Sequence, residues 1–217
     1  MAINKVVFGD NTLIDLTDTT ATESDVAKDK IFHKKDGTIG SGTAIISDYN
    51  CKAGALINGA FANNITKIGH LVNEGASLFT QFANMQRLEE VEEIELNGIA
   101  NIGQAFIGCI KLKKAPKMNT SSVSIMRSMF ENCTALEDLP LYDTSNTSDM
   151  RTMFSGCTSL TDASLNNILQ MCANAVNYSR TKTLVAIGIT STNYSASRIQ
   201  NLSNYQAFIN AGWTTGF

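Results

Sequence analysis

Three of the five cysteines recur at a constant interval, and each lies in the same short pattern of phenylalanine, cysteine and leucine. The pattern occurs as Phe106-Cys109-Leu112, Phe130-Cys133-Leu136 and Phe154-Cys157-Leu160, and one period earlier as Phe82-Met85-Leu88. The chain's two prolines, Pro116 and Pro140, are separated by the same interval. A fixed period of about 24 residues with recurrent apolar anchors predicts a solenoid, in which each repeat buries its apolar face against its neighbours.

We therefore predict an α/β fold, a leucine-rich-repeat solenoid of about four to five repeats of about 24 residues. The solenoid is expected over residues 45–163, and a shorter, degenerate repeat at its start is marked by Phe61-Ala62-Asn63-Asn64. Residues 1–44 are expected to form a small β module. Residues 164–217 are expected to form a C-terminal α/β capping segment that covers the open end of the stack. A separate functional domain at 164–217 is the alternative.

Within the regular repeats, residues 88–96, 112–118 and 136–142 are predicted to be short strands. Pro116 and Pro140 cannot donate a ladder hydrogen bond, so each strand is expected to end or bulge there. Short helices are predicted after Ser121 and Asn146, because apolar residues follow at helical spacing. Those apolar residues are Val123, Met126 and Phe130 in one repeat, and Met150 and Phe154 in the next.

Charged residues in the strands repeat with the same 24-residue period and alternate in sign. The sets are Glu89, Lys113 and Glu137; Glu90, Lys114 and Asp138; and Glu93 and Lys117. In a stack these become neighbours of opposite charge, each pair contributing roughly 0.2–1 kcal/mol. The face is either a solvated surface that holds the register or a ligand-binding surface, and we favour the former.

The five cysteines (51, 109, 133, 157 and 172) form no Cys-x-x-Cys pair. The central three are expected to stack about 5 Å apart, one above the other, as small buried apolar groups. A disulfide or a metal site is the alternative, although zinc sites use closer ligand pairs and often histidine. The two histidines, His33 and His70, lie outside the repeated pattern, and His70 is expected to be a packed or surface residue.

The two ends of the chain differ from the repeats. Short β-prone runs at 6–8 and 13–16 flank a turn, and Asp36-Gly37 predicts a second hairpin. Gly40-Ser41-Gly42 is expected to be a flexible exit from this module. Towards the C-terminus we predict a helix at 165–172, a strand at 183–187, and a helix at 199–209 that stops near Gly212.

No catalytic, cofactor-binding or metal-binding residues are expected, and no cofactor, so the chain is predicted not to be an enzyme. The sequence has no Gly-x-Ser-x-Gly, no phosphate-binding loop and no His-Glu-x-x-His. The carboxylates of residues 89–95 leave a cell-wall or glycan enzyme as an alternative. A net charge of −3 does not favour nucleic acid. Neither a secretory signal nor an apolar run of membrane-spanning length is recognised, so we expect synthesis in the cytoplasm and no membrane insertion.

Two stretches of the array resemble known repeats. Residues 102–112 resemble the BspA-like, or Treponema-type, leucine-rich repeat, whose core reads Ile-Gly-x-x-Ala-Phe-x-x-Cys-x-x-Leu and is one residue shorter here. Residues 143–157 resemble the related repeat of Mycoplasma-type surface lipoproteins. The resemblance covers roughly residues 60–163, and it implies the solenoid fold together with a role in adhesion or host contact.

The two ends resemble proteins of phages. Residues 32–43, of the form Phe-x-x-x-x-Gly-x-x-x-x-Gly-Thr, are similar to short modules of minor structural and tail proteins of phages that infect Gram-positive bacteria. Residues 203–213 resemble the ends of leucine-rich phage and prophage proteins. This resemblance implies a virion protein, attached to other virion proteins through residues 1–44, whose solenoid contacts a host-surface glycan or protein. A purely structural decoration or collar subunit and a bacterial surface adhesin are the alternatives, and homo-oligomerisation stays open.

Overall fold

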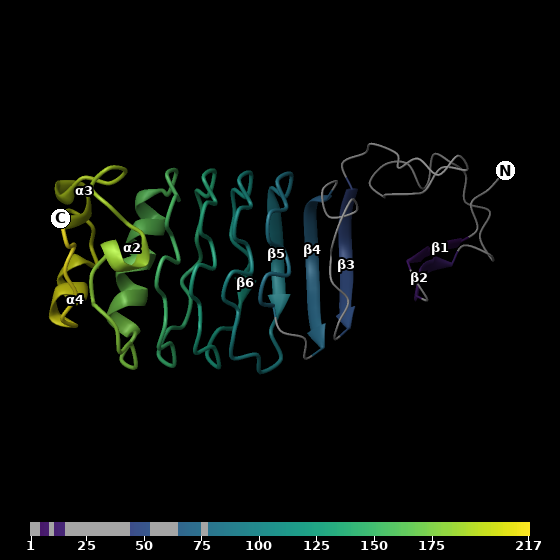
Figure 1. The fold of residues 1–217 in the computed structure, drawn as a ribbon, viewed down its shortest axis with the longest axis horizontal. Helices are drawn as coiled ribbons and strands as arrows, with labels where there is room; N and C mark the ends of the chain where they lie inside the picture. The colour runs from purple at the N-terminus through teal and green to yellow at the C-terminus, as the bar shows by residue number, and fades with distance from the viewer. Residues whose placement is uncertain (1–4, 9–10, 16–43, 53–64, 75–77) are drawn as a thin grey trace.

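The chain winds through successive coils that are stacked along one axis (Figure 1). The computed structural model describes residues 5–8, 11–15, 44–52, 65–74 and 78–217. Residues one period apart lie next to each other in neighbouring coils, as the parallel bridges between backbone segments show. Those bridges join Glu90 to Lys114 and Lys114 to Asp138 on one side, and Asn101 to Ile125 and Ile125 to Asp149 on another. The period seen in the sequence is therefore the length of one coil.

One side of the stack is a four-stranded parallel sheet. Its strands are β3 (Ala44–Lys52), β4 (Ile65–Glu74), β5 (Glu90–Glu95) and β6 (Lys117–Met118), paired in that order. The strand predicted at 88–96 corresponds to β5. The strand predicted at 112–118 is reduced to the bridge at Lys114 and to β6, which begins directly after Pro116, and 136–142 contributes only the bridge at Asp138. The ladder is thus interrupted at Pro116, whose nitrogen has no hydrogen to donate.

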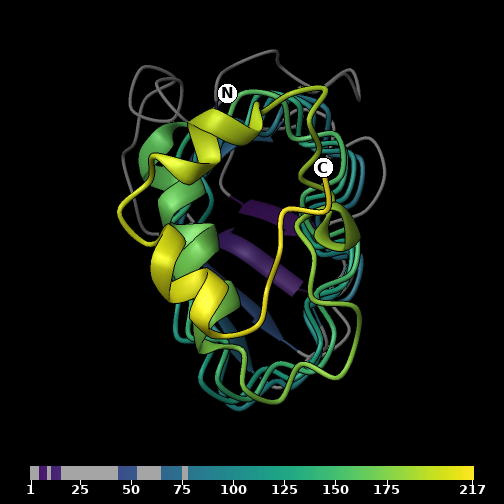
Figure 2. The same cartoon turned by 90° about the vertical axis from the view of Figure 1, so that its left-hand side faces the viewer.

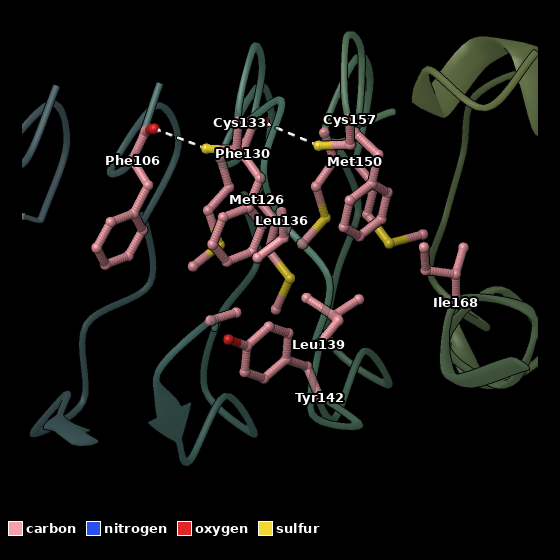
Figure 3. Close-up of a cluster of buried hydrophobic side chains, with 14 of the residues drawn as sticks. Phe106, Met126, Phe130, Cys133, Leu136, Leu139, Tyr142, Met150, Cys157 and Ile168 are labelled. Carbon is pink, nitrogen blue, oxygen red and sulfur yellow. Dashed lines mark hydrogen bonds between the residues drawn. The ribbon is translucent and has the colours of Figure 1, made fainter. Parts of the chain in front are cut away.

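The core of the stack is a column of aromatic rings. Phe82, Phe106, Phe130 and Phe154 are all buried, and their ring planes are nearly parallel. Ring centroids of successive residues are 4.7, 5.5 and 6.2 Å apart. The cysteine and leucine of each pattern are also buried, as Figure 3 shows for Cys133 and Leu136 beside the ring of Phe130. Met85, at the cysteine position of the first coil, is buried too. The phenylalanines of the pattern therefore stack on one another from coil to coil.

The helices predicted at 121–130 and 146–154 are wrong, because both stretches are turns. Some of their backbone amides close local turns, such as Met129 N to Met126 O at 3.2 Å, and others donate out of the coil. Phe130 N donates to Met153 O at 3.0 Å, and Phe154 N donates to Ile187 O at 2.9 Å. A residue with positive φ recurs in every coil and interrupts any right-handed helix. These residues are Thr80, Gln104, Ser128 and Thr152.

Side-chain hydroxyls tie the coils together at the corners of the stack. Ser124 Oγ donates to Ala100 O and Ser148 Oγ to Ser124 O, both at 3.2 Å. Thr134 and Thr158 make the same contact at another corner, each to a carbonyl oxygen one coil earlier. Ala100 O and Ser124 O also accept hydrogen bonds from backbone amides of the next coil, so these hydroxyls reinforce the backbone pairing between coils.

The C-terminal segment begins with α2 (Asp162–Asn174), which confirms the predicted helix at 165–172. Thr161 caps it, because its side chain accepts a hydrogen bond from Ser164 N. The strand predicted at 183–187 is wrong, and the segment instead forms the 3₁₀ helix η2 (Val185–Ile187). Its carbonyls accept hydrogen bonds from the last regular coil, with Phe154 N donating to Ile187 O at 2.9 Å. This segment therefore lies where a further coil would lie.

The single helix predicted at 199–209 is two short helices, α3 (Ala196–Gln200) and α4 (Tyr205–Asn210). The break follows from Asn166 on α2, whose side-chain oxygen accepts hydrogen bonds from Ser203 Oγ and from Asn204 N at 3.1 and 2.8 Å. The predicted end near Gly212 is confirmed, because Gly212 has a left-handed φ of 82°. In Figure 2, which looks along the stack, α4 (yellow) lies against α2 (green).

The predicted hairpin at the N-terminus is confirmed for its two strands. β1 (Lys5–Phe8) and β2 (Asn11–Asp15) pair in antiparallel register. The hairpin predicted at Asp36-Gly37, the glycine-rich exit at 40–42, His33 and the degenerate repeat at 61–64 lie outside the described residues. Within the described part of the chain, no helix has the length and apolar character needed to cross a membrane.

Candidate functional site

The outer surface of the parallel sheet carries the charged residues that the sequence pointed to. Val91 and Ile94 of β5 face the core, whereas the glutamates around them reach the surface. We call this surface the charged sheet face. Its members are Lys67, His70, Glu90, Glu92, Glu93, Glu95, Lys114 and Lys117.

Glu90 lies at the centre of the charged sheet face, between two lysines of neighbouring coils. Its carboxylate is 3.2 Å from Lys67 Nζ and 3.4 Å from Lys114 Nζ. Burial alone would raise the pKa of Glu90, but the hydrogen bonds from Lys67 and Lys114 outweigh it and hold the pKa below its usual value. The predicted alternation of sign between coils is therefore confirmed here, and the backbone bridges of Glu90, Lys114 and Asp138 confirm the register.

His70 lies at the surface of β4, where its Nε2 is 3.0 Å from Glu95 Oε1. It borders a hollow of about 380 Å³ whose other lining residues are Gly69, Glu90, Val91, Glu92, Glu93, Lys114, Ala115 and Lys117. No serine, threonine or cysteine is among these lining residues, so the hollow offers carboxylates, amines and an imidazole but no hydroxyl or thiol nucleophile. Both signs of charge lie side by side, which suits binding of a polar, mixed-charge surface.

The cysteines of the repeats are core residues, as the sequence predicted. Cys109, Cys133, Cys157 and Cys172 are free thiols and are buried. Each repeat cysteine donates to the carbonyl of a phenylalanine in the preceding coil; Cys133 Sγ is 3.1 Å from Phe106 O (Figure 3). Burial raises the pKa of the Cys109 and Cys157 thiols to about 12. Because thiolates are the reactive and metal-binding form, these thiols are unsuited to either chemistry.

Metal binding has no support in the described part of the chain. Among those residues, no three histidine, cysteine, aspartate or glutamate side chains lie close enough to hold a metal ion. Cys51 belongs to β3, and His33 lies outside the described residues.

A second charged surface was missed in the sequence. Arg127 and Arg151 are separated by one full period and therefore lie in the same position of neighbouring coils. Arg151 is hydrogen-bonded to Asp149, with Nε and a terminal nitrogen 2.9 and 2.6 Å from the two carboxylate oxygens. The signal was available, since the same spacing that revealed the alternating charges also pairs these two arginines.

Stacked coils with an aromatic core and side chains held in fixed register on the outside define a repeat protein with an extended surface. A family model described as "Mycoplasma protein of unknown function, DUF285" matches residues 76–184. Because this match covers just over half of the chain, the protein belongs to that family. No curated protein and no solved structure matches the chain. The matched residues contain the regular coils, α2 and the start of the segment that follows them.

Proposed function

We propose that the chain is a phage virion protein, part of a tail, baseplate or fibre, in which a leucine-rich-repeat solenoid at 45–163 presents a surface for recognition of the host. Residues 1–44 attach it to other virion proteins. The observation that carries the proposal is the charged sheet face, where the Lys67–Glu90–Lys114 cluster is held in register by paired strands. Side chains ordered before binding lose little conformational entropy when a partner docks, so such a surface favours binding.

The assignment to the leucine-rich-repeat class rests on the coil length and on the resemblance of residues 102–112 to the BspA-like repeat. The buried Phe, Cys and Leu positions of successive coils support it, because each stacks on its own kind. The virion assignment rests on the resemblance of residues 32–43 and 203–213 to phage proteins. Binding without catalysis is the role proposed for the whole chain.

Deletion of residues 1–44 tests the division of labour. The truncated chain is expected to keep the circular dichroism spectrum of the stacked coils but to be absent from purified particles. Incorporation at the level of the full chain would contradict attachment through residues 1–44. An amino-terminal label on the full chain, located on particles by electron microscopy, gives its position independently.

The role of the charged sheet face is tested with the purified full chain and host cells. Glu93→Lys reverses an exposed charge that borders the hollow on this face. Glu131→Lys makes the same chemical change away from it and is the matched control. We expect cell binding to fall only with Glu93→Lys. Absence of wild-type binding would instead support a purely structural decoration or collar subunit.

A second candidate, a bacterial surface protein, is favoured by the family description, which names mycoplasma proteins. It predicts that antibodies against the chain label the surface of intact bacterial cells that carry no phage particles. The virion proposal predicts label on particles and none on such cells. The two outcomes exclude each other, so one immunolabelling experiment separates the candidates.

A further inference from the structure

Arg127 and Arg151, which belong to neighbouring coils, place two positive charges next to each other on a surface outside the charged sheet face. Gln104 N donates to Arg127 O and Ser128 N donates to Arg151 O, both at 2.9 Å, so residues 127 and 151 occupy one position in adjacent coils. Adjacent coils paired in this way are about 4.8 Å apart. Like charges at this separation repel, whereas the charged sheet face avoids repulsion by alternating the signs of Glu90, Lys114 and Asp138. On this arginine surface, the positive charges of neighbouring coils are therefore not separated by a negative charge, as they are on the charged sheet face.

Arg180 adds a third positive charge to the arginine surface. Arg180 lines the same hollow as Arg151 and is close enough to Asp149 for its charge to lower the pKa of that carboxyl, after the larger effect of the hydrogen bond from Arg151. Asp149 is the one carboxylate that the described residues place against an arginine on this surface, and both of its oxygens bond to Arg151. The side chains of Arg127 and Arg180 make no hydrogen bond or ion pair with any residue that the structure describes. Two guanidinium groups are thus free to bind an anion.

The hollow beside Arg151 and Arg180 also supplies hydroxyl groups. Its volume is about 550 Å³, and its lining residues are Arg151, Thr152, Ser179, Arg180, Thr181 and Ala186. Ser179 and Thr181 are exposed, so their hydroxyls can donate to a ligand. Thr152 is engaged with Ser128, 2.7 Å away.

Two buried polar groups that are linked to the lining of this hollow have no partner among the described residues. They are the hydroxyl of Tyr178, which directly precedes Ser179, and the indole nitrogen of Trp213, whose ring stacks on Tyr178 at 4.9 Å. Buried tyrosine and tryptophan usually find a hydrogen-bond partner. The charges of Asp149, Arg151 and Arg180 all act on the Tyr178 hydroxyl, which places it near the arginines. An anion bound by these arginines would act on Tyr178 and, through the stacked rings, on Trp213.

We propose that this hollow binds a phosphate group, held by the guanidinium groups of Arg151 and Arg180 and by the hydroxyls of Ser179 and Thr181. Arg127, one coil away, binds the next phosphate of a chain of phosphodiester-linked sugars or polyols. A carboxylate presents its two oxygens in one plane and is satisfied by one arginine, whereas donors that converge from four side chains suit a tetrahedral phosphate group, which keeps two non-bridging acceptor oxygens even when it is esterified on both sides. Tyr178 and Trp213 are buried, so no exposed aromatic ring of this site can stack a nucleobase, and a sugar or polyol phosphate fits better than nucleic acid.

The test uses the purified full chain, inorganic phosphate and poly(glycerol phosphate). Trp213 is the only tryptophan, and its ring stacks on Tyr178, so its fluorescence reports on changes at Tyr178. We expect both ligands to change the emission, and Arg180→Gln to weaken both by about tenfold or more. Arg127→Gln is expected to weaken the polymer severalfold and to leave inorganic phosphate unchanged. The Arg180 side chain has no hydrogen bond or ion pair to lose among the described residues of the free protein, and circular dichroism verifies that the variants are folded.

Lys117→Gln on the charged sheet face is the matched control, because it removes one positive charge elsewhere. An equal loss of affinity in this variant would show a general charge effect and overturn the proposal. So would wild-type protein that binds neither ligand at millimolar concentration, or that binds a single-stranded oligonucleotide as tightly as poly(glycerol phosphate). The measurements need neither cells nor particles, so their failure would leave the proposed virion role standing, and failure of that role would leave phosphate binding measurable.

Discussion

Gly156 and Asn132 provide a test of how tightly the coils are stacked. One backbone position with positive φ recurs once in every coil and is occupied in turn by Asn84, Gly108, Asn132 and Gly156. A Cβ atom added to Gly156 would lie 2.6 Å from Asn132 Oδ1 and 3.2 Å from Asn132 Cα. The asparagine side chain of one coil therefore fills the space left by the glycine of the next. We predict that Gly156→Ala destabilises the fold through this contact as well as through the backbone.

The two contributions can be separated with Gly98. Its φ of 81° is close to the 78° of Gly156, but a Cβ atom there would meet nothing within 4 Å. Gly98→Ala should therefore lower the free energy of unfolding by about 1 kcal/mol, the cost of a left-handed alanine. Gly156→Ala adds the crowding against Asn132, which is worth about 1–3 kcal/mol for an overpacked site. The expected total for Gly156→Ala is about 2–4 kcal/mol.

Urea unfolding followed by circular dichroism measures these free energies. Combining Gly156→Ala with Asn132→Gly should restore about 1 kcal/mol or more, because the crowded side chain is removed while glycine tolerates the φ of 63° at position 132. Equal destabilisation by Gly98→Ala and Gly156→Ala would refute the reasoning. A double variant that is no more stable than Gly156→Ala would do so too.

Three further outcomes are expected. Phe130→Ala should cost about 3–5 kcal/mol in urea unfolding, because the ring is buried between its neighbours in the aromatic column. In the Glu90→Lys variant the new lysine lies beside Lys67 and Lys114, so three positive charges are adjacent. The free energy of unfolding should fall by about 1 kcal/mol, and this loss should be smaller at high salt. Burial raises the thiol pKa of Cys109 and Cys157 to about 12, from an ordinary value of 9.0. As the pH rises, the unfolded chain loses these protons before the folded protein does. The free energy of unfolding should therefore fall between pH 9 and 12, by up to about 1.4 kcal/mol per pH unit for each thiol. Urea unfolding of Cys109→Ala across this pH range should show a shallower fall.

The sequence predicted the register of the coils because the period constrains several independent properties at once. Glu90, Lys114 and Asp138 were placed together by charge, and Phe106 and Phe130 by apolar character, and both placements agree with the structure. A single coil length accounts for both. The core residues could therefore be identified without any knowledge of the backbone path.

Local structure within each coil could not be predicted in the same way. Apolar residues at 123, 126 and 130 fit a helix, yet a coil that points a side chain inwards every three or four residues has the same pattern. The two differ in where the amides bond, and the acceptor of Phe130 N belongs to another coil. A contact of this kind depends on the whole stack and leaves no trace in a short window of sequence. The split of the expected helix at 199–209 has a similar cause, since Asn166 lies on α2.

The candidate binding surfaces were predicted unequally. The charged sheet face was found because its signs alternate, and its functional reading stays a prediction. The arginine surface was missed because Arg180 comes from the segment beyond the regular coils and reaches Arg151 only in three dimensions. Period alone could pair Arg127 with Arg151, but the third arginine required the fold.

The step from the last regular coil to η2 has a consequence for how such a chain can vary in length. Phe130 N bonds to the carbonyl of Met153, whereas Phe154 N bonds to that of Ile187, across a clearly longer stretch of chain, and both bonds have normal lengths. The excess is taken up on the flank that continues the sheet, where α2 takes the place of the non-helical segment 138–150 and contacts Leu139 and Thr144 of the coil before it. Stacking thus fixes the positions at which each coil is hydrogen-bonded to the next, but not the path of the chain between those positions. Segments of different lengths can therefore be inserted on that flank, while the residues of the opposite flank keep their hydrogen bonds to the neighbouring coil.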